Sequence, residues 1–319
     1  ILRCDDFDYG QNSNRMPINM ASFAAAGQGN VYPDILGGTN TNFNNPDNCI
    51  WITREAWLDA LAPSMSVGKP IWQMGNDEYE AAIKKAVTFH STYTPYIYSA
   101  AIENYDTGYP AAHTPLHIAF PYDETAHTLY DGVTQEWEWM IGDSLLAAPI
   151  WGVDYATQTA RNIYLPEGEW MDYETGEIFE GPITLTDYAL PIDKVPAFVG
   201  GKGILIGEEQ ENKGEYFVEV FPVSQKGTQY DYTYTDGETK STILANMDGF
   251  NPANLVVTDT TTGQTVPFAT DDVTRAVRFA YTPGHDYEVT GGKSMGLMSH
   301  AVLSCPGQVV GDEVTGSLS

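Results

Sequence analysis

The stretch GDSLLAAPI (Gly142–Ile150) marks the point at which the sequence changes character. Upstream of it, the spacing of apolar residues predicts a long helix over residues 77–103, with Pro95 as a point where that helix could break. Downstream, short apolar runs bounded by Gly, Pro and Asp recur about every ten residues, which is typical of a β-sandwich. The stretch therefore lies at a junction between strand–helix units and a β-rich region.

The first 110 residues alternate between short strands and helices. Residues 1–4 predict a strand, and the acids Asp5, Asp6 and Asp8 follow it as at the carboxyl end of a buried parallel strand, although an acidic loop or helix cap is the alternative. The next expected elements are a helix over 15–28, a strand over 30–38, a helix over 53–61 opening on Thr53, and a strand over 67–74. This alternation indicates a parallel sheet, but only about three βα units fit, too few to close an eight-stranded barrel.

The rest of the chain is expected to form two β units. Residues 111–206 make up the first, and residues 207–291 the second, in which an alternating run is followed by the hairpin turn Asp236-Gly237-Glu238. Residues 292–319 are rich in Gly, Ser and Val without a clear period. We interpret them as a linker or the start of a truncated module.

Composition limits the kinds of partner. The 319 residues carry 15 basic and 43 acidic side chains, a formal net charge of -28, which argues against binding nucleic acid or an anionic membrane. The 20 Tyr and 7 Trp suit surfaces that bind sugars, because flat rings pack on the apolar faces of pyranoses. Cores and strand contacts of β-rich proteins are the more common use of such residues.

No cofactor or metal is expected from the sequence. Its three cysteines (Cys4, Cys49 and Cys305) are far apart, and its six histidines show no metal-binding spacing. Phosphate loops and nucleophile elbows are also missing. The chain begins without Met, has no signal peptide and has no run near the roughly 18 apolar residues of a membrane span, so we expect a fragment of a longer protein with no membrane partner.

Several segments together resemble one enzyme family. They are DILGG (Asp34–Gly38), the helical segment Lys84–Ser99, HTPL (His113–Leu116) and MIGD (Met140–Asp143). These are similar to the D-I-G-G, L-x-P-Y-I-Y, M-R-P-L and M-x-G-D segments of glycoside hydrolase family 31, the retaining α-glycosidases. The resemblance covers about residues 1–290 and is strongest over 94–205.

The resemblance implies a multidomain fold of class α/β plus all-β: the C-terminal part of a (β/α)8 barrel followed by two β-sandwich domains. The implied units are the last βα units of a catalytic barrel (1–110), a proximal β-sandwich (111–206), a distal β-sandwich (207–291) and the linker or truncated module (292–319). The missing N-terminal barrel portion would then be a partner of this chain.

Two aspartates catalyse hydrolysis in this family, a nucleophile and a general acid/base, and they need environments that hold one ionised and the other protonated. The nucleophile's W-x-D-M-N motif has no match in these residues. The resemblance places the acid/base about one βα unit before Asp34, among Asp5, Asp6 and Asp8. Asp6 is preferred and Asp5 is second, because both directly follow the apolar strand.

Two further residues are candidates for binding substrate. Asp34 could accept hydrogen bonds from sugar hydroxyls, or it could cap a turn before Gly37 and Gly38. Trp72 could stack on a sugar, or it could be a core residue beneath the barrel rim. The family's P-x-x-R-x-H stretch corresponds to residues 63–68, where Ser66 replaces the Arg and the His is missing. Such a loss should change which hydroxyls are recognised, which makes a galacto or N-acetylamino sugar reasonable.

The sequence thus predicts part of a retaining α-glycoside hydrolase that cleaves a terminal α-linked sugar from an oligosaccharide or glycan. On its own the chain is expected to be inactive, because it lacks the nucleophile. The alternative is a non-catalytic carbohydrate-binding or scaffold fragment. The expected location is extracellular, cell-surface or periplasmic.

Overall fold

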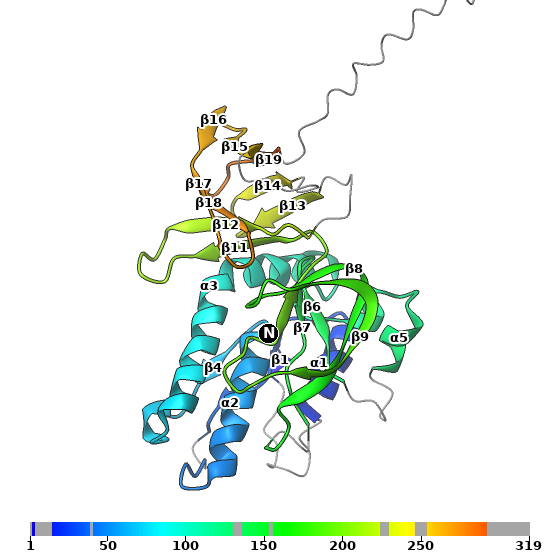
Figure 1. The fold of residues 1–319 in the computed structure, drawn as a ribbon, viewed down its shortest axis with the longest axis vertical. Coiled ribbons are helices and arrows are strands. Elements are labelled where there is room, and N and C mark those ends of the chain that lie inside the picture. The colour runs from blue at the N-terminus through cyan, green and yellow to red at the C-terminus, as the bar shows by residue number, and fades with distance from the viewer. Residues whose placement is uncertain are drawn as a thin grey trace, which may run out of the picture.

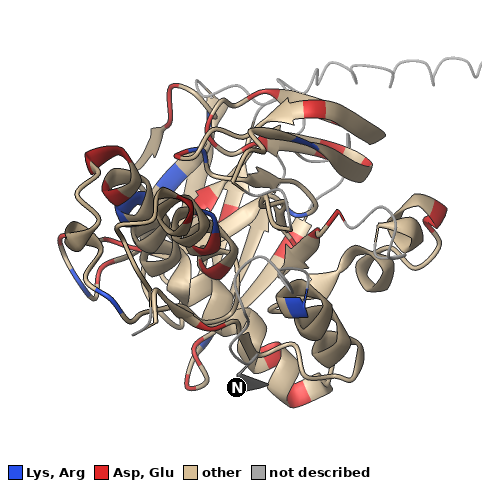
Figure 2. Ribbon diagram, turned by 90° about the horizontal axis from the view of Figure 1, so that it is seen from below, with Lys and Arg blue, Asp and Glu red and all other residues tan. Residues whose placement is uncertain are grey.

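The computed structural model describes residues 2–3, 15–38, 41–129, 136–152, 156–223, 230–245 and 254–291. Figure 1 shows helices α2 and α3 beside the sheet that contains β6 to β9, and the later strands gathered at the far end of α3. Figure 2 shows Asp and Glu on helices and sheets alike, so the acidic character is not confined to one element. Within the described ranges, no helix is long and apolar enough to cross a membrane.

Parallel strand pairs form the N-terminal part of the fold. The paired strands are β1 (Leu2–Arg3) with β2 (Val31–Tyr32), and β3 (Ile35–Leu36) with β4 (Ser66–Val67). Parallel neighbours need a crossover connection, and helices α1 (Arg15–Ala25) and α2 (Pro46–Ala60) lie in the two connections. The predicted alternation of strands and helices is therefore present, although each strand is only two residues long.

Helix α2 begins earlier than the sequence indicated. Asn45 is its N-cap, and the Asn45 side chain accepts a hydrogen bond from the backbone N–H of Asp47 at 3.2 Å. Thr53, the expected cap, is instead fully buried within the helix, where its hydroxyl donates to the carbonyl of Cys49 at 2.8 Å. A β-branched polar residue that can bond to the preceding turn does not have to end a helix.

Helix α3 (Asp77–Thr107) is the longest described element and is not broken at Pro95. The side chain of Asn76 caps its first turn, and Gly108, with φ of 79°, ends it in the left-handed conformation. The strand expected over residues 67–74 ends at Val67, and the 3-10 helix η1 (Ile71–Gln73) leads into α3. Helix α3 packs along α2 at one end and against the later sheets at the other (Figure 1).

A six-stranded sheet follows α3, with the order β5-β6-β7-β10-β8-β9. Its strands are β5 (Thr114–Pro115), β6 (Trp139–Ile141), β7 (Leu145–Ala147), β8 (Ala160–Asp172), β9 (Ile178–Ala189) and β10 (Ala197–Val199). Two short helices, α4 (Leu116–Ala119) and α5 (Glu124–Thr128), lie between β5 and β6. All of its neighbouring strands are antiparallel, as expected for a β-sandwich layer.

Buried polar side chains attach α2 to this sheet region. The Arg54 guanidinium donates to the carbonyls of Leu190 and Gln158 at 3.0 and 2.9 Å. The Trp57 indole N–H donates to the carbonyl of Ile192 at 2.9 Å. Because backbone carbonyls accept these bonds, the position of α2 depends on the path of the chain just before β8 and just after β9.

Two further sheets complete the described fold, with orders β11-β12-β18-β17 and β13-β14-β19-β15-β16. Their strands are β11 (Ile204–Glu208), β12 (Tyr216–Val220), β13 (Tyr230–Thr235), β14 (Lys240–Ala245), β15 (Val256–Asp259), β16 (Gln264–Val266), β17 (Phe268–Thr270), β18 (Val277–Tyr281) and β19 (Tyr287–Thr290). Rings meet between the sheets: Tyr234 lies 5.5 Å from Tyr281, and Phe279 lies 5.4 Å from Tyr287, between centroids. The two sheets therefore share a core, as in a β-sandwich.

His113 is a buried histidine in this fold. It is 1% exposed, and its ring lies 4.6 Å from that of Trp139, between centroids. Its Nδ1 has no hydrogen-bond partner among the described residues. Burial lowers the pKa of His113 from 6.5 to about 3, so the folded protein holds a neutral imidazole.

We predict that His113 makes the fold acid-sensitive. An unfolded chain binds the His113 proton near pH 6.5, whereas the folded chain binds it only near pH 3, so stability is lost as pH falls through this range. Between pH 6.5 and 4 this loss is roughly 3 kcal/mol. The variant His113→Leu should lose less stability over that interval, as measured by urea unfolding at each pH. The exposed His127 provides the matched variant, His127→Leu, which should keep the pH dependence of the wild type.

Candidate active site

The sequence predicts catalytic and sugar-binding residues in the segments that follow the parallel strands β1, β2 and β4. Segments that follow parallel strands leave the sheet at the same edge, which is where active sites of such sheets are built. Asp5 and Asp6 follow β1 in the sequence but lie outside the described residues. The described part of these segments contains Asp34 and Trp72.

Asp34 lies between β2 and β3 and is only 5% exposed. Its Oδ1 accepts a hydrogen bond from the backbone N–H of Ile35 at 2.7 Å, which fixes the carboxylate relative to β3. The choice between a hydroxyl acceptor and a turn cap stays a prediction. A fixed carboxylate at this edge suits the first role, because hydroxyl recognition needs an acceptor that is already oriented.

Asp59 is the neighbour of Asp34 that the sequence reasoning missed. It projects from α2, is 0% exposed, and neither of its carboxylate oxygens has a hydrogen-bond partner among the described residues. Burial, and then the negative charge of Asp34, raise the pKa of Asp59 well above its ordinary value. The folded protein therefore favours the neutral, protonated form of the Asp59 carboxyl group.

A signal for Asp59 was present in the sequence. It is the one charged residue in the otherwise apolar run Ala56–Ala62, and Glu55 lies one helical turn before it. Glu55 is 1% exposed, so α2 turns two acids inward rather than toward solvent. Acids in an apolar helical stripe are rarely tolerated without a specific role.

Ser66, which stands where the family has an Arg, pairs its hydroxyl with that of Tyr32 across β2 and β4. The following loops pack tightly, because a Cβ at Gly68 would collide with the side chain of Ile35. Gly37 has φ of 66°, which favours glycine at the end of β3. The hydroxyl pair of Tyr32 and Ser66 thus joins β2 to β4, and the close approach of Gly68 to Ile35 packs β4 against β3.

Trp72 lies on η1 and is 69% exposed, so it is not a core residue. The described part of the chain shows no hydrogen bond, ion pair or ring stacking between Trp72 and Asp34. Asp34 follows β2 and precedes β3, Trp72 follows β4, and the structure does not join their side chains. Among the described residues there is also no group of three or more His, Cys, Asp or Glu that could hold a metal ion.

Comparison with known proteins shows a family likeness for one segment of the chain. Residues 108–205 match the family model for the glycosyl hydrolase family 31 C-terminal domain. The mouse myogenesis-regulating glycosidase is 34% identical over 179 residues, covering 53% of this chain and 23% of the relative. Residues 108–205 are thus similar to the C-terminal domain of glycosyl hydrolase family 31.

A second relative and a solved structure are also similar to this chain. Alpha-glucosidase 2 of Bacillus thermoamyloliquefaciens is 31% identical over 183 residues, covering 55% of this chain and 21% of the relative. The chain thus spans about a quarter or less of the length of either relative. In fold, it resembles the cycloalternan-forming enzyme of Listeria monocytogenes in complex with a pentasaccharide substrate, with a TM-score of 0.67, 19% identity, and coverage of 88% of this chain and 31% of that one.

We predict that Asp59 is destabilising when it ionises. Its folded pKa is raised, so its stability contribution is complete below the unfolded pKa of about 3.9 and is lost as pH rises toward the folded pKa. Each pH unit in that interval costs about 1.4 kcal/mol. The variant Asp59→Asn, which cannot ionise, should therefore be more stable than the wild type at pH 7–8 and should not show this loss in urea unfolding.

The exposed Asp231 on β13 supplies the control Asp231→Asn, which should keep the wild-type pH dependence. If the stability of Asp59→Asn relative to the wild type does not increase from pH 4 to 7, the predicted cost of ionising Asp59 is wrong.

Proposed function

We propose that this chain is the C-terminal part of a retaining α-glycoside hydrolase that cleaves a terminal α-linked sugar by double displacement with two aspartates. The relatives support a glycosidase or glycosyltransferase that acts on α-linked sugars. They include the 1,6-alpha-glucosyltransferase of Sporosarcina globispora and the sulfoquinovosidase of Escherichia coli. These enzymes are named for different sugars and reactions, so a family likeness alone does not select the substrate.

One observation carries the proposal. The parallel strands β3 and β4 are not fully covered, and the chain continues from them into the segment that matches the family 31 C-terminal domain. On β3, Leu36 is buried, whereas Ile35 on the opposite face is 36% exposed. Val67 on β4 pairs with Leu36 and lies on the face opposite Ile35, and it is 45% exposed, so both faces of this strand pair expose an apolar side chain. Parallel sheets are covered on both faces, so apolar residues exposed on short parallel strands indicate a missing layer. In our proposal the earlier strands of a (β/α)8 barrel supply that layer.

This proposal divides the chain as the resemblance implies. Residues 1–110 are assigned to the last units of the barrel, 111–206 to a proximal β-sandwich and 207–291 to a distal one. Residues 292–319 are assigned to a linker or a further module. An extracellular, cell-surface or periplasmic location completes the proposal, since glycan substrates are common there.

The proposed chemistry divides two roles between carboxyl groups. Asp6, or else Asp5, protonates the leaving oxygen and then activates water, and an aspartate supplied by the preceding part of the protein forms the covalent glycosyl-enzyme. Asp34 accepts hydrogen bonds from sugar hydroxyls, and the exposed ring of Trp72 offers an apolar surface to the sugar. The Asp34 carboxylate is already oriented by its contact with Ile35.

Specificity is proposed to differ from that of an ordinary α-glucosidase. The Ser66 hydroxyl, paired with that of Tyr32, replaces a charged guanidinium at the strand end. A neutral hydroxyl pair can donate or accept hydrogen bonds, whereas a guanidinium only donates. An axial hydroxyl or an N-acetyl group could use this difference, so galacto and N-acetylamino sugars are included among the proposed substrates.

We predict that Asp6→Asn in the full-length protein lowers kcat for a methyl α-glycoside by about 10²–10⁴-fold, the usual contribution of general acid catalysis. A panel of glucosides, galactosides and N-acetylamino glycosides identifies the substrate first. The loss should be smaller for a dinitrophenyl glycoside, whose leaving group needs no proton. This dependence on the leaving group separates an acid/base role from a structural one.

Asp5→Asn and Asp8→Asn are the matched variants. Asp5→Asn also tests Asp5, the second candidate for the acid/base. If Asp6→Asn retains full activity, the acid/base assignment to Asp6 is wrong. If the full-length protein hydrolyses no α-glycoside but binds sugars, the non-catalytic carbohydrate-binding alternative replaces the enzyme. Hydrolysis by the isolated 319-residue chain would contradict the proposal that its nucleophile lies elsewhere.

A further inference from the structure

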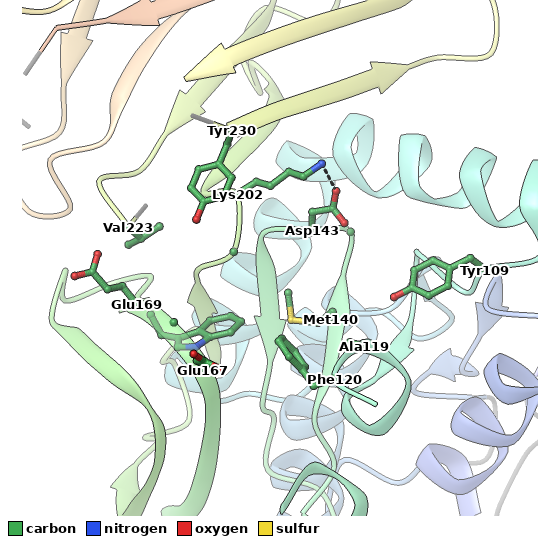
Figure 3. Close-up of a pocket in the computed structure, with 14 residues that line it drawn as sticks. Tyr109, Ala119, Phe120, Met140, Asp143, Glu167, Glu169, Lys202, Val223 and Tyr230 are labelled. Atoms are coloured by element: carbon green, nitrogen blue, oxygen red, sulfur yellow. Dashed lines mark ion pairs between the residues drawn. The ribbon is translucent and has the colours of Figure 1, made fainter. Parts of the chain in front are cut away.

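A pocket of about 390 Å³ lies between the six-stranded sheet, the segment that follows α3 and the start of β13. Figure 3 shows aromatic and charged side chains around it, supplied by segments far apart in the sequence. The lining residues used below are Tyr109, Phe120, Asp143, Glu167, Lys202 and Tyr230. Its volume falls within the range of roughly 300–1,000 Å³ that is common for small-molecule sites.

An irregularity in β8 supplies Glu167. Leu165 pairs with Ile183 and Gly168 pairs with Gly181, so two residues of β8 oppose a single residue of β9. Such a bulge redirects side chains, and Glu167 is exposed within a strand whose preceding residues are buried. The bulge therefore places a carboxylate at the pocket rim.

An ion pair between Asp143 and Lys202 lines the pocket between Tyr109 and Tyr230, and the dashed line in Figure 3 marks it. The ammonium of Lys202 lies 2.9 Å from Oδ2 of Asp143, and the two side chains are 32% and 47% exposed. Their turns touch closely, because a Cβ at Gly201 would collide with the carbonyl of Asp143. The pair is therefore fixed by backbone contacts yet reachable from solvent, with donor and acceptor atoms side by side.

The pocket continues into a second one of about 770 Å³, and the two share Ala119, Phe120 and Glu167. The second pocket contains Tyr122, which is 98% exposed. The two pockets thus form one groove, called the β8 groove below, long enough for a chain of linked units rather than a single small molecule.

The side chains of the β8 groove match the chemistry of a saccharide. Tyr109, 41% exposed, and Tyr122 present rings that can cover the apolar C–H faces of pyranoses. The Asp143–Lys202 pair can accept and donate hydrogen bonds to adjacent hydroxyls. Lys202, the cation that lines this pocket, is paired with Asp143, so Glu167 and Glu169 leave an excess of acidic groups that disfavours an anionic ligand.

We propose that the β8 groove binds an uncharged oligosaccharide of at least two sugar units. The proposal goes beyond the hydrolase reaction, because none of the residues assigned to that reaction lines the groove. It rests on the proposed function only in the choice of α-linked probes. Binding here would hold a polymer on the β-sheets of the protein while its chain end is processed.

The test uses isothermal titration calorimetry with maltopentaose and isomaltopentaose as uncharged probes and pentagalacturonate as the anionic probe. The full-length protein carries Asp6→Asn, which limits hydrolysis during the titration. Tyr109→Ala should raise the Kd for at least one uncharged probe roughly tenfold at the groove site. Glu167→Gln, a nearly isosteric change, should weaken the same site, and pentagalacturonate should show no binding there.

Tyr105→Ala is the matched control, because Tyr105 lies four residues before Tyr109, is 86% exposed and lines neither pocket. It should bind as the parent protein does, and unchanged thermal unfolding should show that all variants fold. In otherwise wild-type protein, Tyr109→Ala should leave kcat and KM for an aryl monosaccharide glycoside unchanged.

The proposal is overturned if Tyr109→Ala and Glu167→Gln both bind the uncharged probes as tightly as the parent. It is also overturned if pentagalacturonate binds the groove equally well, or if Tyr109→Ala abolishes hydrolysis of the monosaccharide glycoside. A protein with no hydrolase activity that still shows Tyr109-dependent binding would contradict the proposed function while supporting the groove.

Discussion

The Tyr96 hydroxyl is the contact on which the arrangement of helices and sheets depends. It donates a hydrogen bond to the carbonyl of Ile141 and accepts one from the N–H of Ser144, both at 2.9 Å. Burial, followed by the charge of Asp143, raises the pKa of Tyr96, so the hydroxyl keeps its proton and can make both bonds. The Ser144 hydroxyl in turn accepts from the N–H of Ile204 in β11. The turn between β6 and β7 thereby joins α3, the six-stranded sheet and β11. Glycine is needed at position 142 of this turn, because a Cβ there would collide with the Tyr96 side chain.

The N-terminal layer is built differently, with polar groups where a stable core would have apolar ones. Arg54 and Asp59 project from the same helix and are both buried, and burial lowers the pKa of Arg54 to about 10. Arg54 recovers part of this cost through two carbonyl acceptors, whereas the Asp59 carboxyl has no such compensation among the described residues. A buried acid of this kind reduces stability, so the presence of Asp59 near Asp34 is better explained by a requirement of the site than by packing.

The sequence predicted those parts of the fold in which local pattern and tertiary structure agree. Apolar spacing predicted α3 over residues 77–103, and the turn Asp236-Gly237-Glu238 joins β13 to β14 as expected. The start of α2 was missed because Asn45 lies in an asparagine-rich loop in which several residues could serve as a cap. Features that depend on distant neighbours were also missed. The pKa of Asp59 is raised by its burial and then by Asp34, which lies far from it in the sequence, and Glu167 lies in a bulge of β8 that appears only in the pairing with β9. Asp5 and Asp6 lie outside the described residues, so their assignment still depends on the family resemblance.

Charge and topology together constrain where a glycan can contact this chain. Acidic side chains occur on all the layers seen in Figure 2, and the formal net charge is -28, so anionic polymers are repelled over much of the surface. Uncharged sugars avoid this repulsion but gain no long-range attraction, and their binding must come from local contacts with rings and fixed hydrogen-bonding groups. The Asp143–Lys202 pair satisfies this condition, because the turn held by Tyr96 also fixes the Asp143 backbone. The Tyr96 contact that joins α3 to the six-stranded sheet therefore also fixes one wall of the β8 groove. A sugar that binds there meets groups that are already ordered, so less conformational entropy is lost on binding.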